Sequence, residues 1–293
     1  MTPMLLAVTV GFALVVPSLA WAQAAQAHRD VTYARGDGKD LRLDIYMPAG
    51  AQAPPLLVWV HGGVWAYGTK AEVPMVFVTN GIATASIDFR QSTEARFPAQ
   101  VHDIKAAIRF LRARATEYGY RAERIAIGGD SSGGHLAALV GVTNGHKELE
   151  GTLGSYLNQS SSVQAIVDYY GASNLMTILA QSTPYGVSVR EPGLRRLLGA
   201  VPANARVLAE LASPVFHVDP SDPPLLLFHG DEDPQMPIEQ SHELESVYRK
   251  MGLDVYLDVV RGAAHGGELF FSPERVQRAL AFLRRTLVER PMP

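Results

Sequence analysis

Short apolar runs alternate along the chain with stretches in which apolar residues recur at every third or fourth position. Continuous apolar runs are typical of strands buried on both faces, whereas alternating apolar and polar positions indicate a half-exposed strand. We therefore predict a half-exposed strand at 41–47 and buried strands at 56–60, 82–87, 124–127, 163–170, 224–228 and 255–260. The helical period predicts helices over 97–118, 135–142 and 273–288.

The order of these elements indicates the fold class. Strands that alternate with helices form βαβ units, in which the strands run parallel and helices cover both faces of the sheet. The 293 residues are enough for one such α/β domain with a large core. The segment 171–212 has short helical patterns but no clear strand, so we expect a small insertion that partly caps the sheet. A plain long connection is the alternative.

The first 22 residues differ from the rest of the chain. Positions 1–22 carry no charged side chain, and an apolar stretch at 4–16 leads to Ala20 and Ala22 in the pattern of a signal-peptide cleavage site. We expect cleavage before Gln23, a single mature domain over 23–293 with no stable membrane span, and a periplasmic or secreted protein. Because no Lys or Arg precedes the apolar stretch, an uncleaved anchor or a merely hydrophobic start is the alternative.

Composition excludes several classes of function. A net charge of −3 gives no indication of nucleic acid or an anionic membrane as a partner. The chain has no cysteine, which rules out a Cys nucleophile and thiolate zinc sites and means that folding proceeds without disulfides. The sequence gives no indication of the oligomeric state.

Residues 128–134 read Gly-Gly-Asp-Ser-Ser-Gly-Gly and contain the pattern G-x-S-x-G. The pattern follows a short apolar strand and precedes a helix of small residues, as a nucleophile elbow requires. Ser131 is therefore the candidate nucleophile, and a Gly/Ser loop with a helix cap is the alternative. We expect the backbone N–H of Ser132 to donate to an oxyanion.

A serine nucleophile needs a base and an acid that orients the base. In folds with this elbow the order along the chain is Ser, acid, His. Of nine histidines, His265 alone follows the last predicted strand, in a loop of small residues, and it is the candidate base. The acid should lie in the loop after the strand 224–228, where spacing leaves Asp231, Glu232 and Asp233 open.

The oxyanion requires further donors from the loop after an early strand. Residues 61–65 read His-Gly-Gly-Val-Trp, and we expect the N–H groups of Gly63 and Val64 to serve. His61 is expected to form bonds within the loop.

With these motifs the chain resembles a known family, the bacterial feruloyl and acetyl-xylan esterase-like (BD-FAE) group of the α/β-hydrolases, near the hormone-sensitive-lipase-like family. The similarity runs from about residue 40 to about 285 and includes HGGVW, GGDSSGGHLAAL, HGDEDPQMPIEQS and AAHGG. It implies a mainly parallel, eight-stranded twisted sheet with helices on both faces. It also implies that Asp233 is the acid, through the family pattern H-G-x-x-D-x-x-V-P, in which Met236 here replaces Val.

Together, the motifs and the family resemblance predict a serine carboxylic-ester hydrolase that acts through an acyl-enzyme on short acyl or aryl esters, such as acylated carbohydrates. No metal or organic cofactor is implied. Trp65, Tyr67, Phe97 and Tyr185 are candidates for a substrate pocket, with packing in the core or cap as the alternative. Three other functions remain open: an arylformamidase-like amidase, a peptidase, and a non-catalytic binding module on the same fold.

Overall fold

The computed structural model describes residues 26–289. The expected signal peptide and its cleavage site lie outside the described residues. Eight strands form one sheet in the order β1-β2-β4-β3-β5-β6-β7-β8. The strands are β1 (Gln26–Gly36), β2 (Lys39–Met47), β3 (Pro55–Val60), β4 (Ala83–Ile87), β5 (Arg121–Asp130), β6 (Ala165–Tyr169), β7 (Leu225–Gly230) and β8 (Val255–Val260).

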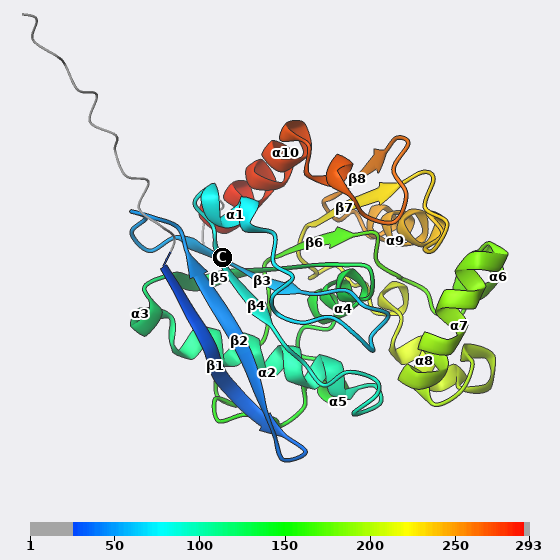
Figure 1. Ribbon diagram of the computed structural model, residues 1–293, viewed down its shortest axis with the longest axis horizontal. Coiled ribbons are helices and arrows are strands. Elements are labelled where there is room, and N and C mark those ends of the chain that lie inside the picture. The colour runs from blue at the N-terminus through cyan, green and yellow to red at the C-terminus, as the bar shows by residue number, and fades with distance from the viewer. Residues whose placement is uncertain (1–25, 290–293) are drawn as a thin grey trace, which may run out of the picture.

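All pairs from β4 to β8 are parallel, whereas β1 and β2 form an antiparallel hairpin at one edge, with β2 also antiparallel to β4. The long hairpin runs diagonally across the lower left of Figure 1. The mainly parallel, eight-stranded sheet predicted from the sequence is confirmed. All the strands predicted from apolar runs are present, although β5 is longer than 124–127 at both ends.

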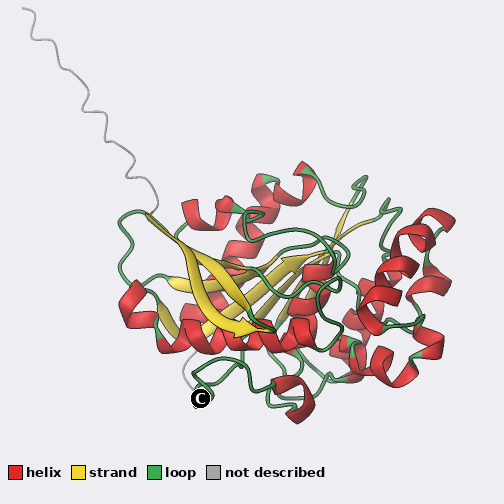
Figure 2. Ribbon diagram, turned by 60° about the horizontal axis from the view of Figure 1, so that its bottom comes forward, coloured by secondary structure: helices red, strands yellow, loops and turns green. Residues whose placement is uncertain are grey.

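Helices cover both faces of the sheet, as Figure 2 shows. One face packs against α1 (Met75–Thr79) and α10 (Pro273–Arg284), whose apolar residues form one core cluster with the sheet. The other face packs against the remaining main helices and forms a second, larger cluster. These are α2 (Ala99–Ala113), α3 (Ala115–Tyr118), α4 (Ser132–Gly141), α5 (Lys147–Glu150) and α9 (Glu239–Lys250).

The N-terminal hairpin departs from the sequence prediction. No strand was predicted before residue 41, yet β1 occupies Gln26–Gly36. The expectation that 41–47 is half exposed was also wrong. Its polar position Asp44 is only 1% exposed because the side chain forms ion pairs with Lys70 and Arg29. A paired charge can be buried where an isolated one cannot, so the alternating pattern misjudged this strand.

The segment 171–212 is helical. It contains α6 (Ile178–Gln181), α7 (Pro184–Leu198) and α8 (Arg206–Leu211), with a short 3₁₀ turn at Pro202–Asn204. A second 3₁₀ turn, at Pro214–Phe216, follows just after the end of this segment. These helices stand together at the right of Figure 1, beside the ends of the parallel strands. The Thr183 hydroxyl donates to the carbonyl of Pro234, which ties the start of α7 to the loop after β7.

The two longest predicted helices end slightly differently from the prediction. The helix expected over 97–118 is divided into α2 and α3, and Gly119 ends it at φ 82°, a left-handed conformation that glycine adopts readily. The last helix, α10, gives way to a single π-helical turn at Arg285–Glu289. Across residues 26–289, none of the helices combines the length and the apolar character needed to cross a bilayer.

Candidate active site

Ser131 lies at a sharp turn between β5 and α4. Its backbone has φ 53° and ψ −119°, and its N–H donates to the carbonyl of Tyr169 at 2.8 Å. The turn is possible because the flanking positions lack side chains. A Cβ at Gly129 would lie 2.5 Å from the carbonyl oxygen of Val60, and one at Gly133 would lie 2.1 Å from it. This is the geometry of a nucleophile elbow.

A continuous hydrogen-bonded chain joins Ser131, His265 and Asp233. The serine Oγ lies 2.9 Å from Nε2 of His265, and Nδ1 of the same ring lies 2.6 Å from Oδ2 of Asp233. With the ring proton on Nδ1, the imidazole donates to the carboxylate and accepts from the hydroxyl. The three residues come from the ends of β5, β7 and β8, at the carboxyl edge of the sheet.

The surroundings of Asp233 keep it ionised. Burial acts to raise the pKa of its carboxyl group. The hydrogen bond from His265, the electrostatic interaction with that residue and the N–H of Met236 outweigh burial and hold the pKa below its ordinary value. The other oxygen, Oδ1, accepts the N–H groups of Gln235 and Met236 at 2.8 and 2.9 Å. Such a carboxylate is suited to hold an imidazole in one tautomer.

The two other acidic residues of this loop lie elsewhere. Asp231 accepts from the N–H of Gly262 at 2.7 Å and from Arg261 at 2.9 Å, and Glu232 is exposed. Within residues 26–289, neither side chain forms a hydrogen bond or an ion pair with His265. The structure thus brings Asp233, and not its neighbours, to the imidazole.

The predicted oxyanion loop lies next to the elbow. Gly63 and Val64 have φ values of 111° and 55°, and no acceptor within residues 26–289 takes up their N–H groups. The loop is held to the elbow by the N–H of Gly62, which donates to Oδ1 of Asp130 at 3.1 Å. Burial raises the pKa of Asp130 to about 6. Ser132 is fully buried at the first turn of α4, where backbone N–H groups lack helical partners.

His61 is part of the framework of this loop, as expected. Its ring is 1% exposed, stacks on Phe89 with centroids 4.6 Å apart, and donates from Nδ1 to the carbonyl of Gly62 at 2.8 Å. Burial lowers the pKa of the ring, so it stays neutral.

The four aromatic candidates for substrate contact fall into two pairs. Trp65 is 0% and Phe97 5% exposed, and both lie in the larger core cluster. The packing alternative therefore describes these two, because both rings are packed among apolar core side chains. Tyr67 and Tyr185 are 59% and 55% exposed, and their rings are open to solvent.

Trp65 has a second role in the framework. Its indole Nε1–H donates to Nδ1 of His135 at 2.9 Å, and Nε2 of His135 lies 2.7 Å from the carbonyl oxygen of Ala212. The buried imidazole therefore links the oxyanion loop, helix α4 and the end of the segment 171–212. Burial lowers the pKa of His135 to about 4, so the link is neutral at physiological pH.

Two residues near the imidazole were not among the candidates. The ring of Tyr170 lies 4.7 Å from that of His265. Arg190 of α7 is 0% exposed, and its Nη2 lies 3.3 Å from Nε2 of His265. A signal for Arg190 exists in the sequence: Gly193, Leu194 and Leu197 follow it at helical spacing and are buried with it, so it lies on the inward face of α7.

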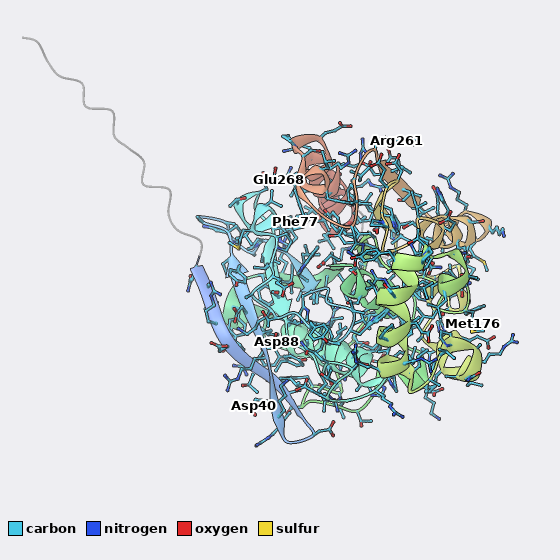
Figure 3. All side chains as sticks on the ribbon, turned by 45° about the vertical axis from the view of Figure 1, so that its right-hand side comes forward. Asp40, Phe77, Asp88, Met176, Arg261 and Glu268 are labelled. Carbon is cyan, nitrogen blue, oxygen red and sulfur yellow. The ribbon has the colours of Figure 1, made fainter. Side chains whose placement is uncertain are left out.

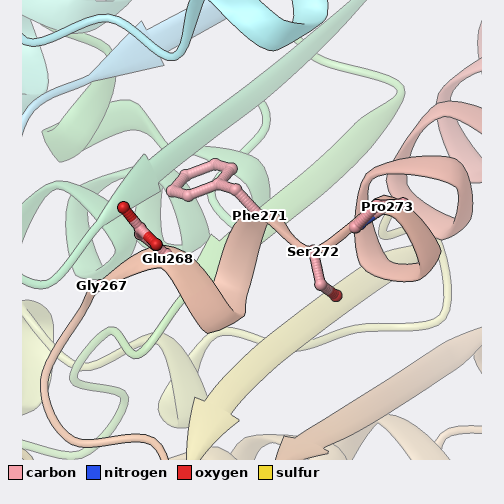
Figure 4. Close-up of a pocket in the computed structure, with 5 residues that line it drawn as sticks. All are labelled: Gly267, Glu268, Phe271, Ser272 and Pro273. Atoms are coloured by element: carbon pink, nitrogen blue, oxygen red, sulfur yellow. The ribbon is translucent and has the colours of Figure 1, made fainter.

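A cavity of about 620 Å³ lies beside the loop that carries His265. It is lined by Gly267, Glu268, Phe271, Ser272 and Pro273 (Figure 4). Arg261 and Glu268, which flank that loop in sequence, both lie in the upper part of Figure 3, whereas Met176 lies toward the right with the segment 171–212. None of Ser131, His265 and Asp233 lines this cavity. The part of the chain that the structure describes contains no cluster of His, Asp and Glu suited to a metal ion.

The mainly parallel eight-stranded sheet, the elbow after β5 and the residue order Ser, Asp, His define an α/β-hydrolase. The chain belongs to the BD-FAE family, whose model matches residues 43–248. The resemblance inferred from the sequence is thereby confirmed.

Curated relatives are named esterases. Esterase LipC of Mycobacterium tuberculosis is 30% identical over 84% of this chain and 62% of its own length. Isoprenylcysteine alpha-carbonyl methylesterase of Arabidopsis thaliana is 27% identical over 82% of this chain and 56% of its own length. The chain thus spans little more than half the length of these relatives.

Solved structures of esterases share the fold of this chain over more than nine tenths of its length. A truncated carbohydrate esterase from gut microbiota has a TM-score of 0.82 and 33% identity, covering 91% of this chain and 98% of that one. Esterase 2 of Thermogutta terrifontis with bound propionate has a TM-score of 0.72 and 26% identity, covering 93% of this chain and 98% of that one.

Proposed function

We propose that this chain is a serine carboxylic-ester hydrolase in which Ser131, His265 and Asp233 form the catalytic triad. The observation that carries the proposal is the hydrogen-bonded chain from Ser131 Oγ through both ring nitrogens of His265 to Asp233, with distances of 2.9 and 2.6 Å. A neutral serine is a weak nucleophile, and this arrangement supplies the base that activates it.

The reaction has two steps. His265 removes the hydroxyl proton through Nε2 as Oγ of Ser131 attacks the ester carbonyl, and it then gives that proton to the departing alkoxide. Water attacks the acyl-enzyme with the same base and releases the acid. Asp233, which is ionised, stabilises the imidazolium that forms in each step.

The transition state carries a negative charge on the former carbonyl oxygen. The N–H groups of Gly63, Val64 and Ser132 are proposed to bind it. Their availability supports this role, because Gly63 and Val64 have no acceptor among the described residues and Ser132 lies at a helix N-terminus. The attachment of Gly62 to Asp130 fixes the loop against the elbow before substrate arrives.

Short acyl or aryl esters, including acylated carbohydrates, are the proposed substrates. A carbohydrate esterase and an esterase with bound propionate are among the similar structures, which supports this range. The exposed rings of Tyr67 and Tyr185 are candidates to contact such substrates. The apolar residues 4–16 and the small residues before Gln23 favour action in the periplasm or outside the cell.

Hydrolysis of p-nitrophenyl acetate by wild type, Ser131→Ala and Ser132→Ala tests the proposal. Wild type should turn over, Ser131→Ala should fall to background, and Ser132→Ala should retain activity because its backbone N–H remains. Butyrate and octanoate esters then measure the acyl length accepted. If wild type is inactive on all three esters but cleaves an N-formyl aryl amine, the amidase function replaces this one.

A further inference from the structure

The guanidinium of Arg190 is buried beside the triad. The residue is 0% exposed, its Nε donates to the carbonyl of Gln235 at 3.2 Å, and its Nη2 lies 3.3 Å from Nε2 of His265. The third nitrogen, Nη1, is buried without a hydrogen-bond partner among the described residues. Buried N–H donors ordinarily have partners, so Nη1 is an unsatisfied donor on a side chain that contacts His265.

The charge of Arg190 is also uncompensated. No carboxylate within residues 26–289 lies at ion-pair distance from it. Asp233 is the carboxylate that favours the charged form of Arg190, but both of its oxygens already accept hydrogen bonds from His265, Gln235 and Met236. Burial lowers the pKa of Arg190 to about 10, which still leaves it charged at neutral pH. Buried charges are ordinarily paired, so the site is electrostatically incomplete.

The position of the guanidinium indicates which half of an ester would meet it. When an ester carbonyl is attacked by Ser131, the departing alcohol oxygen must lie within reach of Nε2 of His265, which returns the proton. Nη2 of Arg190 lies next to that same nitrogen. The oxyanion loop at Gly63 and Val64 is proposed to bind the carbonyl oxygen, so the alcohol half is the part of the ester that Nε2 of His265 and Nη2 of Arg190 would share.

We propose that Arg190 is a specificity-determining residue that binds a carboxylate in the alcohol half of the ester, close to the bond that is cleaved. The inference rests on the proposed esterase function and narrows it to acyl esters of hydroxy acids, among them acylated uronic acid residues. A carboxylate matches the planar fork of arginine and accepts charge-assisted hydrogen bonds from Nη1 and Nη2. A neutral alcohol would leave the buried charge unpaired.

A purely structural role makes a different prediction. The bond from Nε to Gln235 joins α7 to the loop of Asp233, and its loss would disturb the triad for every substrate alike. The ratio of activities on a charged and a neutral substrate of the same size therefore distinguishes recognition of the substrate carboxylate from structural support of the triad.

The experiment measures kcat and KM by acid release at constant pH for 2-acetoxypropanoate and 2-acetoxypropanamide. The corresponding 3-acetoxy pair varies the distance between the ester bond and the carboxylate. Wild type should favour the carboxylate of at least one pair by about tenfold in kcat/KM, mainly through KM. Arg190→Gln should bring that ratio close to one, and Arg190→Lys should retain part of it. Arg196→Gln, at an exposed position of the same helix, should keep the wild-type ratio.

The inference is overturned if wild type shows no preference in either pair, or if Arg190→Gln lowers both members of a pair equally. In those cases continued hydrolysis of p-nitrophenyl acetate by wild type would leave the proposed esterase function intact. Failure of wild type on every ester would overturn the function itself.

Discussion

The contacts of the Asp233 side chain distinguish it from the other acidic residues of its loop. Its oxygens accept from His265, Gln235 and Met236, whereas Asp231, two positions earlier, is directed at Gly262 and Arg261. Periodicity and spacing could not separate the two, because loop conformation has no period. The family pattern predicted Asp233 as the acid, and the loop places its carboxylate 2.6 Å from the imidazole.

Replacement of Asp233 by Asn should leave the fold intact and lower kcat on p-nitrophenyl acetate by roughly 10³–10⁴-fold, since the amide favours the wrong imidazole tautomer. The matched control is Asp231→Asn, whose carboxylate lies on the surface of the same loop and pairs with Arg261. Its activity should stay near that of wild type. Equal losses in the two variants would assign the acid role to neither.

At the scale of elements, the buried bond between Trp65 and His135 joins three segments that the sequence presented as separate. The HGGVW loop was interpreted through its glycines, and the tryptophan as a pocket candidate with packing in the core or cap as the alternative. Its true surroundings depend on α4 and on Ala212, which lies 77 residues beyond His135 in the chain. Long-range pairings of this kind have no local signal, whereas apolar patterns predicted every strand except β1 and helical periods predicted α2, α4 and α10.

Trp65→Phe should destabilise the protein more than Trp59→Phe, by about 1–3 kcal/mol in the free energy of unfolding. Both changes remove the same atoms from a buried indole. Only Trp65 has an Nε1–H with a partner, while that of Trp59 has none among the described residues. Denaturant titration of the two variants measures the difference, and equal losses would show that the bond to His135 contributes nothing to stability.

At the scale of the whole molecule, buried acids and imidazoles set opposite dependences on pH. Burial raises the pKa of Asp168 to about 7 and lowers the pKa of His135 and His229 to about 4. The folded chain thus holds an extra proton on Asp168 between about pH 4 and 7, and stability falls there as pH rises. The two buried histidines have the opposite effect: they lower stability as pH falls below about 6.5, because the unfolded chain takes up protons on these rings and the folded chain does not.

Asp168→Asn should therefore gain stability relative to wild type as pH rises from 4 to 8, by on the order of 2–4 kcal/mol. Asp168 accepts from the N–H of Gly171 through Oδ1, while its Oδ2 is buried without a partner among the described residues. An exposed carboxylate, Asp40 in the edge hairpin, provides the control. Urea titrations at pH 5 and pH 8 measure the effect. A stability difference from wild type that stays constant with pH would contradict it.

The elbow also has a consequence for how the protein could be followed as it folds. Helix α4 is buried along its entire length, and the backbone of Ser131 is fixed by a bond to Tyr169 at the end of the neighbouring strand. His265 and Asp233 arrive from segments more than 100 residues later. Collapsed intermediates with native helices would therefore lack activity, and the recovery of ester hydrolysis during refolding would report the arrival of the complete topology rather than of secondary structure.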